Sequence, residues 1–104
     1  MEEKLMSSET IFKDDVQNKI KKPAMYRVFL LNDDYTTMDF VVEVIVNIFH
    51  KPIPQATKIM IDVHKAGKGI VGIFTYDIAL TKITQVELMA KERGFPLKAG
   101  MEEE

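Results

Sequence analysis

The apolar residues in "YRVFLLNDDYTTMDFVVEVIVNIF" change their period at one point, and this change constrains the fold more than any other feature of the chain. Before it, "MYRVFLL" (25–31) is short, rich in residues favoured in β-strands and preceded by Pro23, which predicts a strand. The polar residues at the change, Asn32, Asp33 and Asp34, therefore mark a passage from strand to helix. After it, apolar residues recur at the spacing of one helix face, at Met38, Val41, Val42, Ile45, Ile48 and Phe49.

Two more helices follow this first one. Thr36 and Asp39 form a weak capping-box pattern at the start of the first helix, and the prolines of "KPIP" (51–54) end it. The second helix ends at the glycines of "KAGKG", which suit a left-handed cap. The third helix could begin at Thr75 or Asp77 and runs to "KERG". The apolar faces are Ala56, Ile59, Met60 and Val63 in the second helix, and Ala79, Ile83, Val86 and Ala90 in the third.

Two further strands complete the pattern. The run "IVGIF" (70–74) is β-branched and continuous, which favours a central strand. The segment "FPLKAGM" (95–101) alternates apolar and polar residues, and Pro96 favours a place at the edge of a sheet. The order β-α-α-β-α-β predicts an α+β fold, in which three helices pack on one side of a three-stranded antiparallel sheet.

The length of 104 residues suits one domain. Residues 1–22 are polar and of mixed sign, with scattered apolar residues, so we expect a flexible N-terminal extension there. The folded core is expected to span residues 23–101. The remaining "EEE" (102–104) is interpreted as an acidic tail.

Charge and composition argue against several classes of protein. With 14 basic and 16 acidic residues, the net charge of −2 gives no electrostatic basis for binding nucleic acid. The chain has no cysteine and hence no disulfide or zinc–sulfur site, which fits the cytoplasm. Its start, "MEEKLMSSET", does not resemble a secretory signal, and no apolar run approaches the roughly 20 residues that cross a bilayer. We therefore expect a soluble cytoplasmic protein that binds neither nucleic acid nor membrane.

Metal binding and catalysis have little support in the sequence. His50 and His64 match no zinc-binding spacing, and no calcium-loop pattern surrounds Asp33 and Asp34, so neither a metal nor a cofactor is expected. Asp33, Asp34 and His64 could form an acid–base set, but the chain has no nucleophile elbow and no cysteine. A small hydrolase is thus a minor alternative, and we do not expect an enzyme.

The binding of a small cationic group fits the polar residues better. If the end of the first strand meets the end of the second helix, the acceptors of residues 32–34 lie near His64 and beside an apolar pocket. An ammonium group has three donors and no acceptor, which such a cluster can satisfy. On local grounds, however, turn chemistry explains "NDD", and a helix C-terminus favours a histidine. Ordinary core packing likewise explains methionines on a helix face.

A resemblance to a known family changes this balance. The segments "KKPAMYRVFLLNDDYTTMDFVVEVI" and "ATKIMIDVHKAGKGIVGIFTYDIALTK", with a closing Pro96–Leu97, closely resemble the ClpS family, adaptors of the Clp ATP-dependent protease. The resemblance spans Pro23 to Leu97. It implies the β-α-α-β-α-β fold, shared with a ribosomal stalk-protein domain. ClpS proteins recognise substrates by a bulky N-terminal residue, the N-end rule, and deliver these N-degron substrates to a Clp AAA+ unfoldase of the ClpA or ClpC type.

The resemblance also implies roles for individual residues. Asn32, Asp34 and His64 would hydrogen-bond the α-amino group of the substrate, and Asp33 would support the same acidic patch. Met38 would exclude the β-branched side chains of isoleucine and valine. The pocket for a leucine, phenylalanine, tyrosine or tryptophan side chain would be lined by Thr36, Met38, Val41, Met60, Val63 and Leu97.

Two more positions follow from the resemblance. Lys82 matches a surface lysine associated with docking on the N-terminal domain of the unfoldase, and the N-terminal extension matches a segment that engages the unfoldase. Thr37 stands where the family usually has proline, which predicts a less rigid start of the helix. The main alternative is a protein-interaction module of the stalk-protein type, in which "NDD" is only a turn and a helix face docks the partner.

Overall fold

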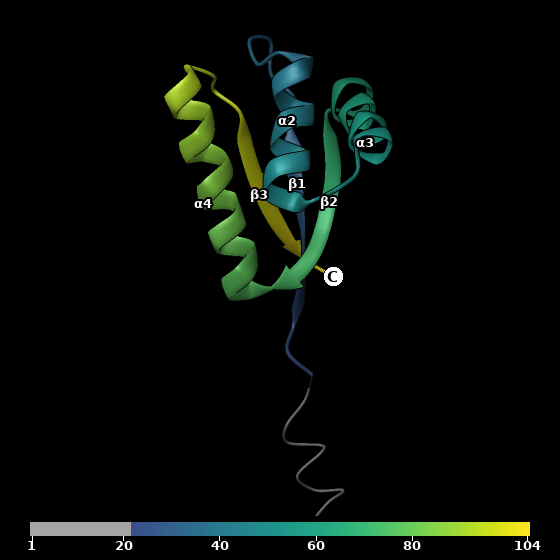
Figure 1. Ribbon diagram of the computed structural model, residues 1–104. Coiled ribbons are helices and arrows are strands. Elements are labelled where there is room, and N and C mark those ends of the chain that lie inside the picture. The colour runs from purple at the N-terminus through teal and green to yellow at the C-terminus, as the bar shows by residue number, and fades with distance from the viewer. Residues whose placement is uncertain (1–21) are drawn as a thin grey trace, which may run out of the picture.

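The computed structural model describes residues 22–104. Its elements follow the predicted order, so the fold class inferred from the sequence is confirmed (Figure 1). The extension predicted for residues 1–22 lies, except for Lys22, outside the described part of the chain. The elements are β1 (Met25–Leu31), α2 (Met38–Phe49), α3 (Ile53–Ala66), β2 (Lys68–Thr75), α4 (Tyr76–Arg93) and β3 (Lys98–Glu103).

The central strand of the sheet is β1, which pairs antiparallel with β2 on one side and β3 on the other. The prediction that residues 70–74 form a central strand is wrong, because β2 lies at an edge. A register shift after Val28 leaves Val71 without a paired residue, and this bulge interrupts the alternation of the strand. Ile70 and Ile73 are 39% and 45% exposed, so the continuous apolar run does not indicate burial on both faces.

The three helices lie on one side of the sheet, with α2 in front of β1 and with α4 and α3 at its flanks (Figure 1). The core forms between these layers, and the predicted inner face of α4 is confirmed at Ala79, Val86 and Ala90, while Ile83 is half-buried. The other buried residues of the core are Val28, Leu30, Phe40, Val41, Val44, Ile45, Ile48, Phe49, Ala56, Val63, Val71 and Leu97.

The first helix begins one residue later than its capping-box pattern suggests. Thr37 is the N-cap of α2, and its hydroxyl accepts a hydrogen bond from the amide of Phe40 at 3.1 Å. The Thr36 hydroxyl makes a different contact, because it donates to the carboxylate of Asp33 at 2.7 Å. At the other end, His50 takes a left-handed conformation with φ 58°, and Pro52 caps the following helix α3.

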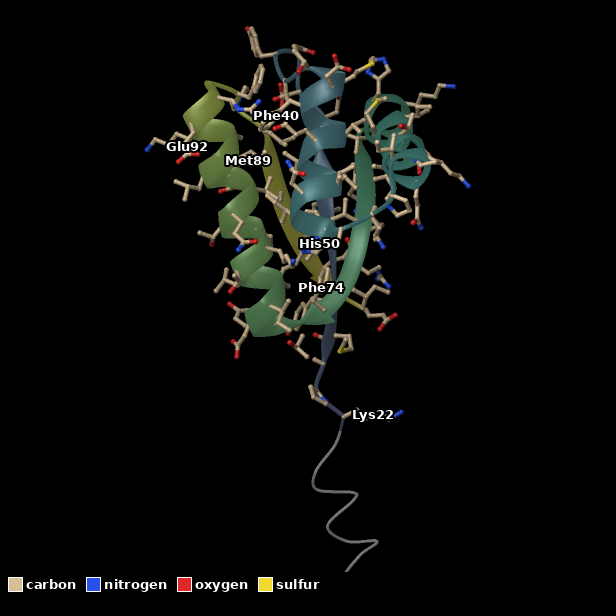
Figure 2. All side chains as sticks on the ribbon, in the orientation of Figure 1. Lys22, Phe40, His50, Phe74, Met89 and Glu92 are labelled. Atoms are coloured by element: carbon tan, nitrogen blue, oxygen red, sulfur yellow. The ribbon has the colours of Figure 1, made fainter. Side chains whose placement is uncertain are left out.

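Side chains of α2 and α4 meet at the end of the molecule where α2 begins. Figure 2 labels Phe40 between these helices, and its ring packs against that of Phe95 with centroids 4.8 Å apart. Arg93, in the last turn of α4, lies over the ring of Phe40 and forms an ion pair with Glu43. These contacts hold the N-terminal half of α2 in place. None of the helices in residues 22–104 is long and apolar enough to span a membrane.

The C-terminal residues belong to the sheet, so the interpretation of residues 102–104 as an acidic tail is wrong. Glu102 lies in β3, and its carboxylate accepts hydrogen bonds from Lys68 at 3.1 Å and from Arg27 at 3.3 Å. These hydrogen bonds lower the pKa of Glu102, and the bond from Lys68 has the larger effect. The amide of Glu104 donates to the carbonyl of Met25 at 2.8 Å, so the pairing with β1 continues to the last residue.

Candidate functional site

A cavity of about 440 Å³ lies where the end of β1, the start of α2 and the C-terminal half of α3 meet. Every residue of the predicted α-amino site lines it, and so do all the predicted pocket residues except Leu97. The full lining is Asn32, Asp33, Asp34, Tyr35, Thr36, Thr37, Met38, Val41, Met60, Val63 and His64. The convergence that the ligand-binding hypothesis required is therefore present.

Backbone contacts cause this convergence. The amide of Asn32, the first residue after β1, donates a hydrogen bond to the carbonyl of Gly67 at 2.9 Å, and Gly67 is the residue that ends α3. Gly67 has φ 86°, a conformation that glycine adopts at little cost. At Gly69, an added Cβ would lie 2.7 Å from Cγ2 of Val63, so only glycine allows α3 to pack this closely on β2. The glycines that sequence analysis assigned to a helix cap thus also position His64 near Asn32.

The loop between β1 and α2 is organised around Asp33. One oxygen of this carboxylate accepts the amides of Tyr35 at 2.8 Å and Thr36 at 2.6 Å, and the other accepts the Thr36 hydroxyl at 2.7 Å. Partial burial raises the pKa of Asp33, but the hydrogen bonds from Thr36 and Tyr35 outweigh it and hold the pKa below its usual value. Asp33 thus serves the loop itself, in the manner of an Asx turn.

Three further polar residues line the cavity, two from this loop and one from α3. Asn32, Asp34 and His64 are all exposed, and within residues 22–104 none of their side chains makes a hydrogen bond. They leave one amide, one carboxylate and one imidazole at the rim, available to a ligand.

The deeper part of the cavity is apolar. Val41 of α2 and Val63 of α3 are 6% and 2% exposed, and Met60 is half-buried between the helices and the rim. Met38, at the first position of α2, is 47% exposed and lies at the mouth. The cavity therefore combines a polar rim, an apolar floor and a flexible methionine side chain at its entrance.

Two predicted site residues lie outside this cavity. The assignment of Leu97 to the pocket lining is not supported, because its side chain is 2% exposed within the core and contributes to a separate hollow beside α4. Lys82 lies on α4, and its ammonium group donates to the carbonyl of Ile48 at 2.6 Å, near the C-terminal end of α2. That contact satisfies a carbonyl at the negative end of the helix dipole.

Tyr35 and Thr37 line the cavity but were absent from the predicted set. Both lie in the motif "NDDYTTM", so their position in the sequence could have indicated them. Thr37, where the resemblance implied proline, caps the start of α2 through its side-chain hydroxyl. No group of three or more acidic or histidine side chains suited to a metal ion occurs in residues 22–104.

Together, the fold and the cavity define a class of protein. It is a small α+β domain in which hydrogen-bond acceptors surround an apolar cavity. This arrangement suits a ligand that carries an ammonium group beside a large apolar side chain. The family described as ATP-dependent Clp protease adaptor protein ClpS matches residues 21–100. The chain belongs to the ClpS family, which confirms the resemblance seen in the sequence.

Individual relatives agree with this assignment. The chain is 61% identical to the ATP-dependent Clp protease adapter protein ClpS of Acetivibrio thermocellus, over 95% of this chain and 100% of that protein. It is 51% identical to the ClpS of Clostridium acetobutylicum, over 94% and 99% respectively. Among solved structures, Agrobacterium tumefaciens ClpS2 bound to L-phenylalaninamide matches with a TM-score of 0.77 and 37% identity, covering 80% of this chain and 100% of that one.

Proposed function

We propose that this chain is a protease adaptor that binds the free N-terminus of proteins beginning with leucine, phenylalanine, tyrosine or tryptophan and delivers them to a Clp AAA+ unfoldase. The observation that carries the proposal is the placement of Asn32, Asp34 and His64 around the rim of one apolar cavity. As an adaptor it modulates the specificity of Clp proteolysis, and it cleaves nothing itself.

The rim suits a protonated α-amino group. Such a group has a pKa of about 7.7–8.0 and is mostly cationic at neutral pH. Its three donors would meet the amide oxygen of Asn32, the carboxylate of Asp34 and an unprotonated imidazole nitrogen of His64. Acetylation removes the charge and two of the donors. It would leave acceptors covered but unpaired, which costs roughly 1–3 kcal/mol each.

The floor suits a bulky unbranched side chain. Burying a leucine or phenylalanine side chain against Val41 and Val63 contributes about 1.5–3 kcal/mol. Met38 at the mouth would contact the first carbons of that side chain and disfavour branching at Cβ. The ligand of the Agrobacterium ClpS2 structure supports this proposal, because L-phenylalaninamide carries a free α-amino group and a benzyl side chain.

The family description, that of an ATP-dependent Clp protease adaptor protein, implies that the partner is a component of the Clp protease system. We propose more narrowly that it is the N-terminal domain of a ClpA- or ClpC-type unfoldase, contacted through Lys82. Lys82 borders a second hollow of about 420 Å³ together with Asn47, His50 and Gln85, on the surface formed by α2 and α4. A cytoplasmic location remains a prediction that the absence of cysteine supports.

The decisive experiment compares two peptides that begin with phenylalanine and differ only in N-terminal acetylation, titrated against the full chain and against His64→Ala. We expect the free peptide to bind and the acetylated peptide to bind at least tenfold more weakly, since one lost charged hydrogen bond is worth about 1.5–3 kcal/mol. His64→Ala should weaken only the free peptide. Equal binding of both peptides would contradict the proposed function.

The interaction-module alternative predicts a different result. If the loop were only a turn, Asp34→Ala and His64→Ala would leave all partner binding intact, and neither peptide would bind. The hydrolase alternative requires turnover of such peptides by the isolated chain, which liquid chromatography of the titration samples detects.

A further inference from the structure

Tyr35 has the most exposed side chain among the large apolar and aromatic residues of the described part of the chain. It is 78% exposed, compared with 65% for Ile53 and 58% for Leu88. The other two tyrosines, Tyr26 and Tyr76, pack edge to face with ring centroids 5.5 Å apart. Within residues 22–104, Tyr35 takes part in no such pair, so its ring does not contribute to the core.

This exposed ring stands on an ordered backbone. The amide of Tyr35 donates to Asp33 at 2.8 Å, and the next amide, that of Thr36, donates to the same oxygen at 2.6 Å. Thr37 then caps α2. The direction of the Cα–Cβ bond at position 35 is therefore fixed before any ligand binds, so little backbone entropy is lost when the ring makes a contact.

The position of the ring relative to a bound N-terminus follows from chain geometry. A ligand whose α-amino group is held by Asn32 and Asp34, and whose first side chain fills the cavity, must pass its second residue over the rim. An extended residue advances about 3.3–3.6 Å, and successive side chains point to opposite sides. The second side chain thus points out of the cavity. Tyr35 follows Asp34 directly and lines the same cavity, so an exposed ring at this position is within reach of that path.

We propose that Tyr35 contacts the second residue of a bound N-terminus and favours an aromatic side chain there. The inference rests on the N-terminus-binding function proposed above and adds a specificity determinant to it. Offset or edge-to-face contacts between two rings are worth about 0.5–1.5 kcal/mol beyond area burial, which corresponds to a roughly two- to twelvefold change in affinity.

A double-mutant cycle tests this inference. Two fluorescent peptides begin Phe-Trp and Phe-Ala and are otherwise identical, and their affinities are measured by anisotropy for wild type, Tyr35→Ala and Tyr35→Phe. Wild type and Tyr35→Phe should prefer the Phe-Trp peptide by about two- to twelvefold, because both keep the ring. Tyr35→Ala should bind both peptides equally. Ile53→Ala is the matched control, since Ile53 is similarly exposed but lies outside the cavity, and it should keep the preference.

Each outcome separates this inference from the function on which it rests. A wild-type protein without the preference, or a preference that persists in Tyr35→Ala, overturns the role of Tyr35 but leaves N-terminal binding standing. Failure of the Phe-Ala peptide to bind, or equal binding of its acetylated form, overturns the proposed function instead. The wild-type comparison needs no substitution, so the absence of a preference there would overturn the role of Tyr35 however the variants fold.

Discussion

The amide of Asn32 and the carbonyl of Gly67 are joined by a hydrogen bond of 2.9 Å, although 34 residues separate them along the chain. Asn32 follows the central strand, and Gly67 follows α3. This bond joins the "NDD" loop to the end of α3, where His64 lies three residues before Gly67. Residues at the ends of two different elements, 32–34 after β1 and His64 in α3, therefore line one cavity.

Replacing Gly67 tests this relationship. Gly67→Ala meets no atom within 4 Å but forces an alanine to φ 86°, so we expect a loss of about 1–2 kcal/mol in the free energy of unfolding. Relief of that strain should also move the carbonyl that Asn32 contacts and weaken binding of a peptide that begins with phenylalanine. Urea unfolding and peptide titration measure the two effects.

Gly94→Ala is the control for this substitution. Gly94 ends α4 with φ 79°, also has no atom within 4 Å of an added Cβ, and lies outside the cavity. It should therefore lose a similar stability without losing affinity. An equal loss of affinity in both variants would mean that general destabilisation, and not the contact with Asn32, affects binding.

The pKa of Asp33 gives a prediction about pH. Because its folded-state pKa lies below the value in the unfolded chain, Asp33 contributes stability that is fully present above the unfolded pKa, about 3.9, and is lost as pH falls through the folded pKa. Asp33→Asn should remove this part of the acid sensitivity, so that stability falls less between pH 5 and the acid range than in wild type. Urea unfolding at several pH values measures it. Asp62→Asn on α3 makes the same change of charge away from the loop, and an equal effect there would contradict the assignment to Asp33.

The organisation of helices was predictable because their apolar residues repeat every three or four positions and Pro52 or a glycine stands at each junction. Two features could not be derived from the pattern of apolar residues. The choice of Thr37 over Thr36 as N-cap depends on Asp33, which binds the Thr36 hydroxyl. The edge position of β2 depends on β3 pairing with the other side of β1, a long-range contact that the run "IVGIF" does not encode.

The candidate site was predictable to a similar extent. The pattern of residues alone predicted a binding site only if the loop and His64 lie close together. Turn chemistry and helix capping explained the same residues. Of the pocket residues that the resemblance implied, all line the cavity except Leu97. The side chain directly before β3 is drawn into the core beneath α4, and no property of "FPLK" distinguishes a core position from a pocket position.

Thr37 offers a test of how the start of α2 is held. Thr37→Ala removes the hydroxyl that accepts the Phe40 amide, and we expect a loss of about 1 kcal/mol of stability together with weaker peptide binding, because Met38 and Val41 lie in the first turns of this helix. Thr37→Ser keeps the acceptor and should preserve both. Thr84→Ala removes an exposed hydroxyl in the middle of α4 and should change neither by a measurable amount. Thermal unfolding and titration provide the comparison.

Leu97 distinguishes a core residue from a pocket residue. Leu97→Ala should lower the free energy of unfolding by about 2–5 kcal/mol, because its buried side chain leaves a cavity. If the chain remains folded, its affinity for a phenylalanine peptide should be unchanged, measured at a temperature well below the unfolding midpoint. Val41→Ala, on the cavity floor, should reduce both quantities. A loss of affinity in Leu97→Ala without the expected loss of stability would mean that Leu97 contributes to the pocket.

Met38 tests the basis of side-chain selection. Its side chain is 47% exposed at the mouth of the cavity, so Met38→Ala should change stability little while removing the atoms that a β-branched ligand would meet. The ratio of affinities for peptides beginning with phenylalanine and with valine should therefore fall, mainly because the valine peptide binds more tightly. Competition titration with the two peptides measures the ratio directly. If Met38→Ala instead weakened both peptides equally, Met38 would supply only apolar contact area, and the discrimination against branching would have to originate deeper in the cavity, at Val41 and Val63.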